Sequence, residues 1–211
     1  IYCDLELASE PAFRFILYML MRGGMVVLNG NDPVATEQSL DLFKIQSMVT
    51  SPRGLAEHLK FYEHTDVRCS LEHILAMGGR VPPELLERVW ARMCTNVFND
   101  YGATEVGSVA SSDLRDINGI PGCAGYVIVP NSVEIVDENR IAKAAETEGI
   151  VRLRTPYMAA EYVGQPEASA LAFRDGWFYP GDYGHVTQQG LLVITGGVEN
   201  RINVGGDTKL V

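Results

Sequence analysis

The sequence predicts an α/β fold, and three observations support that prediction. Short apolar segments alternate with helix-period patterns through the first half of the 211 residues. Proline and glycine stand where these patterns start and stop. From about Gly119 onward the pattern changes to short β segments separated by turns, which predicts a second, β-rich part.

The first half predicts alternating strands and helices. Strands are expected over residues 25–28, 45–49, 73–77 and 95–100. Helices are expected over residues 13–20, 33–43, 52–62 and 83–93. Short apolar strands separated by helices form parallel sheets that are covered on both faces. We therefore expect a flavodoxin-like parallel sheet with helices on both faces, and its ligand edge lies at the carboxyl ends of the strands.

The second half predicts a small, barrel-like β-rich subdomain. Its strands are expected over residues 133–136, 150–154 and 191–195, each next to a turn sequence. We accordingly divide the chain into an α/β subdomain over 1–118, the β-rich subdomain over 119–196, and a hinge over 197–211 that begins a further domain.

Composition narrows the possible partners. The formal net charge is −10, from 17 basic and 27 acidic residues, so a nucleic-acid partner is not expected. No apolar run approaches the length of a membrane span. The four cysteines are spaced neither as metal ligands nor as a CxxC pair, which predicts free thiols in a reducing, cytoplasmic setting. The chain begins at Ile1 without an initiator methionine and stops at Val211, so we expect an internal fragment of a longer protein.

The segment from Asp100 to Glu105 combines three groups that suit a nucleotide. Tyr101 offers an aromatic face for a purine, and Gly102 allows a close backbone approach. Thr104 offers a hydroxyl to a phosphate oxygen, and Glu105 offers a hard oxygen ligand to Mg²⁺. A glycine-containing turn with no ligand remains the alternative for this segment taken alone.

Asp182 lies between Gly181 and Gly184 on a predicted tight turn. A carboxylate exposed there could accept hydrogen bonds from both hydroxyls of a ribose. The alternative is a turn aspartate that satisfies its own backbone, which is the usual role of aspartate beside glycine.

The order of these segments resembles the adenylate-forming (AMP-binding) superfamily, which includes acyl-CoA synthetases, peptide-synthetase adenylation domains and firefly luciferase. The matching segments are, in order, Gly78-Gly79, YGATE at 101–105, GWFYPGDYG at 176–184 and the glycine-flanked stretch 195–209. Tyr157, Tyr162 and the segment Gln165-Pro166-Glu167-Ala168 also look like the family's sequence before the GWF motif.

The resemblance implies a role for each nucleotide-site residue. Tyr101 would stack on adenine, Thr104 would contact the α-phosphate, and Glu105 would hold Mg²⁺. Asp182 would bind the ribose hydroxyls.

Further residues would complete the site by the same resemblance. Gly78 and Gly79 would border the adenine and acyl pocket, and Asp100 and Gly102 would belong to the nucleotide site. Residues near Met77 and Ala103 would line the acid pocket.

The implied activity is that of an AMP-forming acid:thiol ligase. A carboxylate would attack the α-phosphorus of ATP, pyrophosphate would leave, and coenzyme A would take the acyl group from the acyl-adenylate. The implied partners are a small carboxylic acid, ATP or AMP, Mg²⁺ and coenzyme A. Catalysis would consist of positioning and of neutralising phosphate charge.

The sequence departs from the family pattern at the hinge. The family's usual arginine is replaced by Gly197, its Asp or Lys by Glu199, and the threonine before the Gly-Asp pair by Pro180. The family's phosphate loop would lie upstream of Ile1, and its small domain with the catalytic lysine would lie downstream of Val211. We therefore expect this chain alone to be inactive.

Three alternatives stay open. Gly197 favours a non-catalytic adenine-nucleotide-binding homologue. A carrier-protein-loading adenylation domain would share the same motifs. An unrelated flavodoxin-like binding module would instead bind a flavin or a phosphate.

Overall fold

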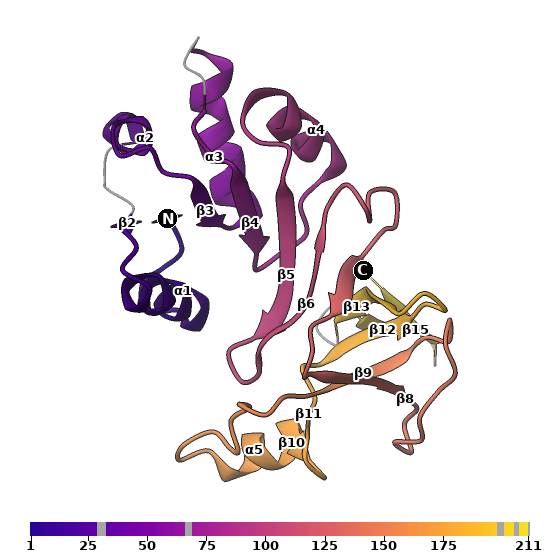
Figure 1. Ribbon diagram of the computed structural model, residues 1–211. Helices are drawn as coiled ribbons and strands as arrows, with labels where there is room; N and C mark the ends of the chain where they lie inside the picture. Colours follow the sequence, from indigo (N-terminus) through magenta and orange to yellow (C-terminus); the bar gives the residue numbers. More distant parts are fainter. Residues whose placement is uncertain (29–32, 66–68, 198–200, 205–206, 211) are drawn as a thin grey trace. The chain divides into compact units, whose positions relative to one another are not determined.

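The computed structural model describes residues 1–28, 33–65, 69–197, 201–204 and 207–210, as drawn in Figure 1. It has the predicted mixed α/β class and divides into two compact units. The first unit comprises Ile1–Asp100 with Ser112–Asn118, and the second comprises Tyr101–Ser111 with Gly119–Val211. Residues 101–111 thus cluster with the second unit, whereas the sequence assigns them to the first segment. The predicted domain boundaries at positions 118 and 196 remain predictions.

The first unit is a parallel sheet with four helices. Its strands follow the order β2-β1-β3-β4-β5, which is the 2-1-3-4-5 order of flavodoxin-like sheets. The elements are β1 (Tyr2–Cys3), α1 (Glu10–Met21), β2 (Val27–Leu28), α2 (Pro33–Leu42), β3 (Ser47–Thr50), α3 (Pro52–Glu63), β4 (His73–Met77), α4 (Pro83–Arg92) and β5 (Val97–Ala103).

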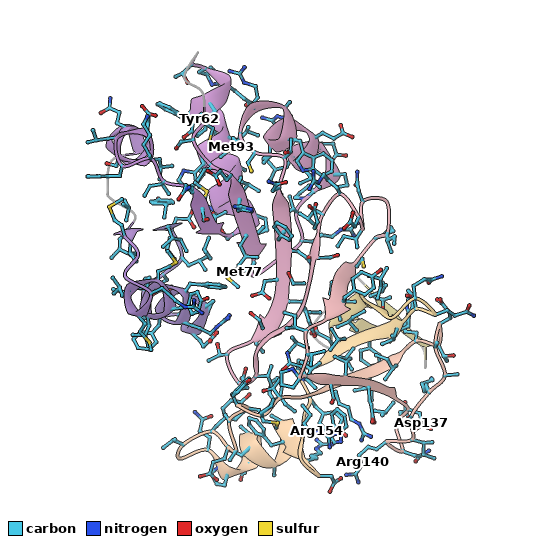
Figure 2. The ribbon with its side chains drawn as sticks, viewed as in Figure 1. Tyr62, Met77, Met93, Asp137, Arg140 and Arg154 are labelled. Carbon is cyan, nitrogen blue, oxygen red and sulfur yellow. The ribbon has the colours of Figure 1, made fainter. Side chains whose placement is uncertain are left out.

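Helices cover both faces of this sheet because successive strand residues point to opposite sides. Ile74 and Ala76 of β4 pack into one buried cluster with residues of α2, α3 and α4. Met77, at the end of the same strand, packs on the other face against α1. Figure 2 labels Tyr62 and Met93 from the first cluster and Met77 from the second.

Two helices begin at serine caps. The Ser51 hydroxyl accepts a hydrogen bond from Gly54 N at 3.1 Å, and Pro52 occupies the first turn of α3. Ser9 caps α1 in the same way through Ala12 N. These caps supply partners for amide groups that a helix start leaves without an intrahelical acceptor.

A buried carboxylate connects the ends of β1 and β3. Asp4 Oδ2 accepts a hydrogen bond from Thr50 Oγ1 at 2.7 Å and lies 3.1 Å from His58 Nε2 of α3. A Cβ at position 54 would stand 2.2 Å from Asp4 Oδ2, so only glycine fits there without displacing the carboxylate.

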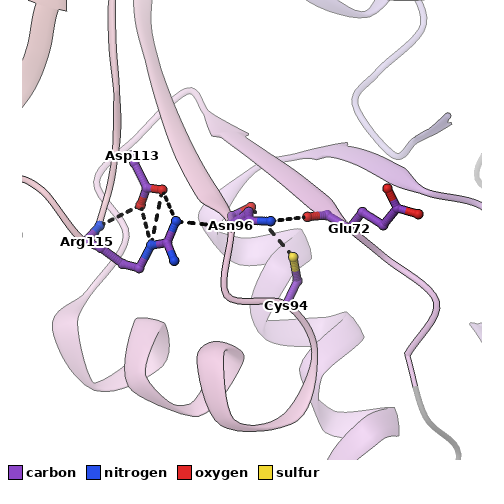
Figure 3. A network of polar contacts seen from close by, with 5 residues as sticks. All are labelled: Glu72, Cys94, Asn96, Asp113 and Arg115. Carbon is purple, nitrogen blue, oxygen red and sulfur yellow. Dashed lines mark hydrogen bonds and ion pairs between the residues drawn. The ribbon is translucent and has the colours of Figure 1, made fainter.

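A polar network fixes the segments that precede β4 and β5 (Figure 3). Asn96 Nδ2 donates to the Glu72 carbonyl at 2.9 Å, and Asn96 Oδ1 accepts from Arg115 at 3.1 Å. Arg115 also pairs with Asp113, and its hydrogen bonds lower the pKa of that carboxyl. The network thereby attaches residues 112–118 to the rest of the first unit.

The second unit is an antiparallel sheet with one short helix. Its strands follow the order β10-β11-β9-β12-β13-β7-β6, and β8 pairs with β9. The elements are β6 (Gly107–Asp113), β7 (Cys123–Val127), β8 (Ser132–Val136), β9 (Gly149–Arg154), α5 (Pro166–Ala172), β10 (Phe173–Arg174), β11 (Trp177–Phe178), β12 (Asp182–Val186), β13 (Leu191–Gly197), β14 (Arg201–Val204) and β15 (Asp207–Leu210). The last two strands pair with each other.

Strand β9 shows the alternation on which this sheet depends. Val151 and Leu153 are fully buried in the second core, while Arg152 and Arg154 point to the other face. Both guanidinium groups lie over the Trp177 ring, at 4.6 and 4.5 Å from its centroid. Figure 2 labels Arg154. It also labels Asp137 and Arg140 in the turn after β8, where the Arg140 amide donates a hydrogen bond to the Asp137 carbonyl.

Within the described ranges, no helix combines the length and the apolar character that a membrane crossing requires.

The core of the first unit gives a direct stability test. Leu59 of α3 is fully buried, so Leu59→Ala leaves a cavity and should lower the free energy of unfolding by about 2–5 kcal/mol. Leu42 is 73% exposed, and Leu42→Ala should change stability by less than about 0.5 kcal/mol. Urea unfolding followed by far-UV circular dichroism measures both variants, and equal losses would contradict the assignment of Leu59 to the core.

Candidate functional site

The YGATE segment lies on a tight hairpin rather than in a loop that follows a strand. Strand β5 continues to Ala103, and the chain turns back at residues 104–106 into β6. The Val106 amide closes the turn on the Ala103 carbonyl at 3.0 Å. The expectation that the strand ends at residue 100 is therefore wrong, because hairpin pairing extends it by three residues.

Gly102 is required by the hairpin itself. A Cβ at this position would lie 2.0 Å from the Gly107 carbonyl oxygen, closer than any real contact allows. The close approach of two backbones thus explains this glycine without a ligand. The turn leaves Thr104 exposed and Glu105 partly exposed.

Tyr101 and Asp182 meet across 81 residues of sequence. The Tyr101 hydroxyl donates to Asp182 Oδ2 at 2.6 Å. Asp182 opens β12, where it pairs with Gly197 of β13, and the Tyr101 ring packs against the second core. In the described part of the chain, Asp182 Oδ1 has no hydrogen-bond partner, so it can accept one from a ligand.

Burial dominates the electrostatics of this pair. Loss of solvation raises the pKa of Asp182, and the hydrogen bond from Tyr101 partly offsets that rise. Burial and the neighbouring carboxylate both raise the pKa of Tyr101 far above its usual range. Both effects favour the protonated phenol, which is the form that donates the hydrogen bond to Asp182.

Glu105 is held by a second tyrosine. The Tyr162 hydroxyl donates to Glu105 Oε1 at 2.6 Å, across 57 residues. Glu105 Oε2 makes no hydrogen bond to any residue that the structure describes, and it remains available as a hard oxygen ligand.

Glu105 and Thr104 are the residues of this turn that could contact a hydrated cation. Among the described residues, no group of three or more His, Cys, Asp or Glu side chains could enclose a metal ion. Mg²⁺ bound with a nucleotide needs only one or two carboxylates, because phosphates and water fill its other positions. Glu105 offers one partly exposed carboxylate, which is within that requirement, and the neighbouring residue in the sequence, Thr104, is exposed.

Three predicted residues lie in the first unit. Gly78 and Gly79 follow β4 directly, and Gly78 takes a positive φ of 77° that favours glycine. Asp100 of β5 stands opposite Met77 of β4, so the two segments are neighbours at the carboxyl edge of the sheet. The Asp100 side chain is 4% exposed and lies 3.8 Å from Arg14.

Gly197, which stands where the family usually has arginine, lies next to Asp182 in the structure. A Cβ at this position would lie 3.7 Å from Asp182 Oδ1, in ordinary contact, so a side chain could be accommodated beside the carboxylate. Glu199, the second departure in the hinge, lies outside the described residues.

Tyr162 belongs to a segment that is similar to the family, but no local pattern in the sequence connects it with Glu105. Its proximity to Glu105 is a purely tertiary contact.

The AMP-binding enzyme family matches residues 3–163. The chain belongs to this family. It is 29% identical over 210 residues to the mitochondrial acyl-coenzyme A synthetase ACSM4 of Rattus norvegicus, covering 93% of this chain and 35% of that protein. It is 31% identical over 135 residues to a 2-succinylbenzoate–CoA ligase of Geobacillus, covering 64% and 27%. The chain thus spans about a third of the length of these curated relatives.

Solved structures share the fold of this chain. The unliganded O-succinylbenzoate coenzyme A synthetase of Bacillus subtilis superposes with a TM-score of 0.84 at 22% identity, covering 98% of this chain and 45% of that one. The amide bond synthetase McbA of Marinactinospora thermotolerans gives a TM-score of 0.85 at 21% identity, covering 99% and 44%. The Bacillus synthetase has also been solved in complex with ATP and magnesium ion.

The raised pKa of Asp182 gives a prediction with a defined sign. A carboxyl whose pKa is raised by folding stabilises the chain below its ordinary pKa, and that stability is lost as the pH rises through the folded-state value. Asp182→Asn removes the charge and keeps an acceptor for Tyr101. The variant should therefore unfold at higher urea than the wild type at about pH 7, and the gain should vanish near about pH 3.5.

Urea unfolding at both pH values tests this, with the exposed Asp116→Asn as the matched control. A variant that is no more stable than the wild type at neutral pH would show that Asp182 is well solvated.

Proposed function

We propose that the protein to which this chain belongs is an AMP-forming acid:thiol ligase of the acyl-CoA synthetase type. This proposal rests on one observation: the Tyr101 hydroxyl lies 2.6 Å from Asp182 Oδ2, in the same unit as the Thr104–Glu105 turn. Membership of the AMP-binding family and the CoA-ligase names of the relatives support this assignment. Those names also favour coenzyme A over a carrier protein as acceptor.

In the second unit, the proposed roles follow from which atoms are available. Asp182 Oδ1 accepts hydrogen bonds from the ribose hydroxyls, while Tyr101 fixes the other oxygen and offers its ring to adenine. The exposed Thr104 hydroxyl donates to the α-phosphate. Glu105 holds Mg²⁺, which neutralises phosphate charge when bound.

In the first unit, Gly78, Gly79 and Asp100 remain proposed nucleotide-contact residues, and Met77 remains a proposed neighbour of the acid. Gly78 and Gly79 leave the backbone after β4 open to a ligand. The proposed substrate is a small carboxylic acid.

The reaction needs no nucleophile from the protein. A carboxylate oxygen bonds to the α-phosphorus as the bond to pyrophosphate breaks, and the thiol then displaces AMP from the acyl-adenylate. The residues of this chain contribute orientation and charge neutralisation.

A cytoplasmic location is proposed from the cysteines. Cys3, Cys69, Cys94 and Cys123 are all free thiols, as is usual in a reducing compartment. Burial raises the pKa of Cys3, Cys94 and Cys123, which disfavours their reactive thiolate forms.

ATP–pyrophosphate exchange by the full-length protein, measured against short, long, aryl and amino acids, tests the proposal. Exchange is expected with one class of acid, and none is expected from the 211-residue chain alone. Asp182→Ala should raise the KM for ATP about 10- to 100-fold, because it removes hydrogen bonds to a charged acceptor. If the full-length protein binds nucleotide but shows no ATP–pyrophosphate exchange with any acid, the result would favour a non-catalytic homologue.

A second test concerns the missing arginine. Gly197→Arg should place a guanidinium near Asp182, favour the ionised form of that carboxylate, and tighten ATP binding about 5- to 10-fold. Gly197→Ala adds only the Cβ and should leave binding unchanged. Calorimetric titration of ATP into each variant measures the effect, and weaker binding by Gly197→Arg would show that glycine is the better residue here.

A further inference from the structure

A loop after β9, residues 155–165, is attached to the turn that carries Glu105. Thr155 Oγ1 donates to the Val106 carbonyl at 3.2 Å, and the Ala159 amide donates to the Glu105 carbonyl at 2.8 Å. The third contact is the 2.6 Å hydrogen bond from the Tyr162 hydroxyl to Glu105 Oε1. Two of these bonds fix the backbone of the turn, and only the third acts on a side chain.

Tyr162 is itself firmly placed. Its backbone amide donates to Ser169 Oγ at 2.8 Å, and that hydroxyl bonds to the Gln165 carbonyl at 2.7 Å. Its ring packs edge-on against Phe173, with centroids 5.3 Å apart. The start of α5 and strand β10 therefore determine where the phenol oxygen lies.

A glutamate side chain on a partly exposed turn is otherwise free to sample several rotamers, and fixing it has an entropic cost. The hydrogen bond to Oε1 restricts that freedom before any ligand arrives. Oε2 then stays available in one orientation, because within the described chain it makes no hydrogen bond.

We infer that Tyr162 is a positioning residue for Glu105, whose hydroxyl fixes the carboxylate so that its second oxygen can ligate the magnesium ion of a bound nucleotide. This inference rests on the proposed function. A residue that hydrogen-bonds to a metal ligand orients that ligand. Its removal weakens metal binding even though the residue does not contact the metal.

The chemistry of the phenol agrees with this role. A phenol donates a hydrogen bond without carrying a charge of its own, so it can hold the carboxylate and adds no negative charge that would compete for the cation.

Tyr162→Phe removes the donor and keeps the ring that packs on Phe173. The test follows ATP binding to the full-length protein by calorimetry while Mg²⁺ is varied. The variant should need about 10-fold more Mg²⁺ for half-maximal enhancement of ATP binding. In a Glu105→Gln background, the same substitution should have no further effect.

Tyr157→Phe is the matched control, because it removes a hydroxyl from the same loop at a side chain that is 78% exposed. It should leave the Mg²⁺ dependence unchanged. Wild-type dependence in Tyr162→Phe, or an equal loss in the Glu105→Gln background, would overturn the positioning role alone. Absence of any Mg²⁺-dependent ATP binding by the wild type would overturn the proposed function and the inference with it.

Discussion

Two backbones approach so closely at Gly102 and Gly107 that a single added carbon would collide with a carbonyl oxygen at 2.0 Å. This contact makes β5 and β6 a tight hairpin, and the hairpin fixes the spacing of Tyr101, Thr104 and Glu105. Tyr101 is then directed to Asp182 of β12, and Glu105 to Tyr162 of the 155–165 loop. The arrangement of the candidate site therefore depends on a steric constraint of the scaffold.

The two carboxylates of this site, Asp182 and Glu105, are each held by a tyrosine. Each accepts a hydrogen bond from a tyrosine through one oxygen and keeps the other oxygen available. Asp182 is buried enough for its pKa to rise, and it depends on Tyr101 for compensation. Glu105 is partly exposed, and its second oxygen is of the hard type that Mg²⁺ prefers. This chain carries a net charge of −10, and both carboxylates contribute to it, so a polyanion bound beside them would need a cation to offset the repulsion.

Most of the periodic elements of the fold could be predicted, and several short ones could not. Strand β4 and the first residues of α2, α3 and α4 agree with the sequence, because apolar spacing and proline mark them clearly. Strand β1 has two residues and helix α5 has seven, too few for a period to show. Strands β6 and β12 were missed as well, since β6 is rich in small polar residues and Gly184 interrupts β12 at a register shift.

The sequence by itself determined the chemistry that is present: an α/β alternation, an aromatic–hydroxyl–carboxylate run, and an aspartate between glycines, in an order shared with a known family. These features are local patterns, or the order of motifs along the chain, so they can be recognised before the chain has folded. Only the tertiary structure decided which groups meet. Tyr101 and Asp182 are 81 positions apart, Glu105 and Tyr162 are 57 positions apart, and no spacing pattern in the sequence connects either pair. Those contacts follow from sheet register and backbone sterics, which exist only once the chain has folded.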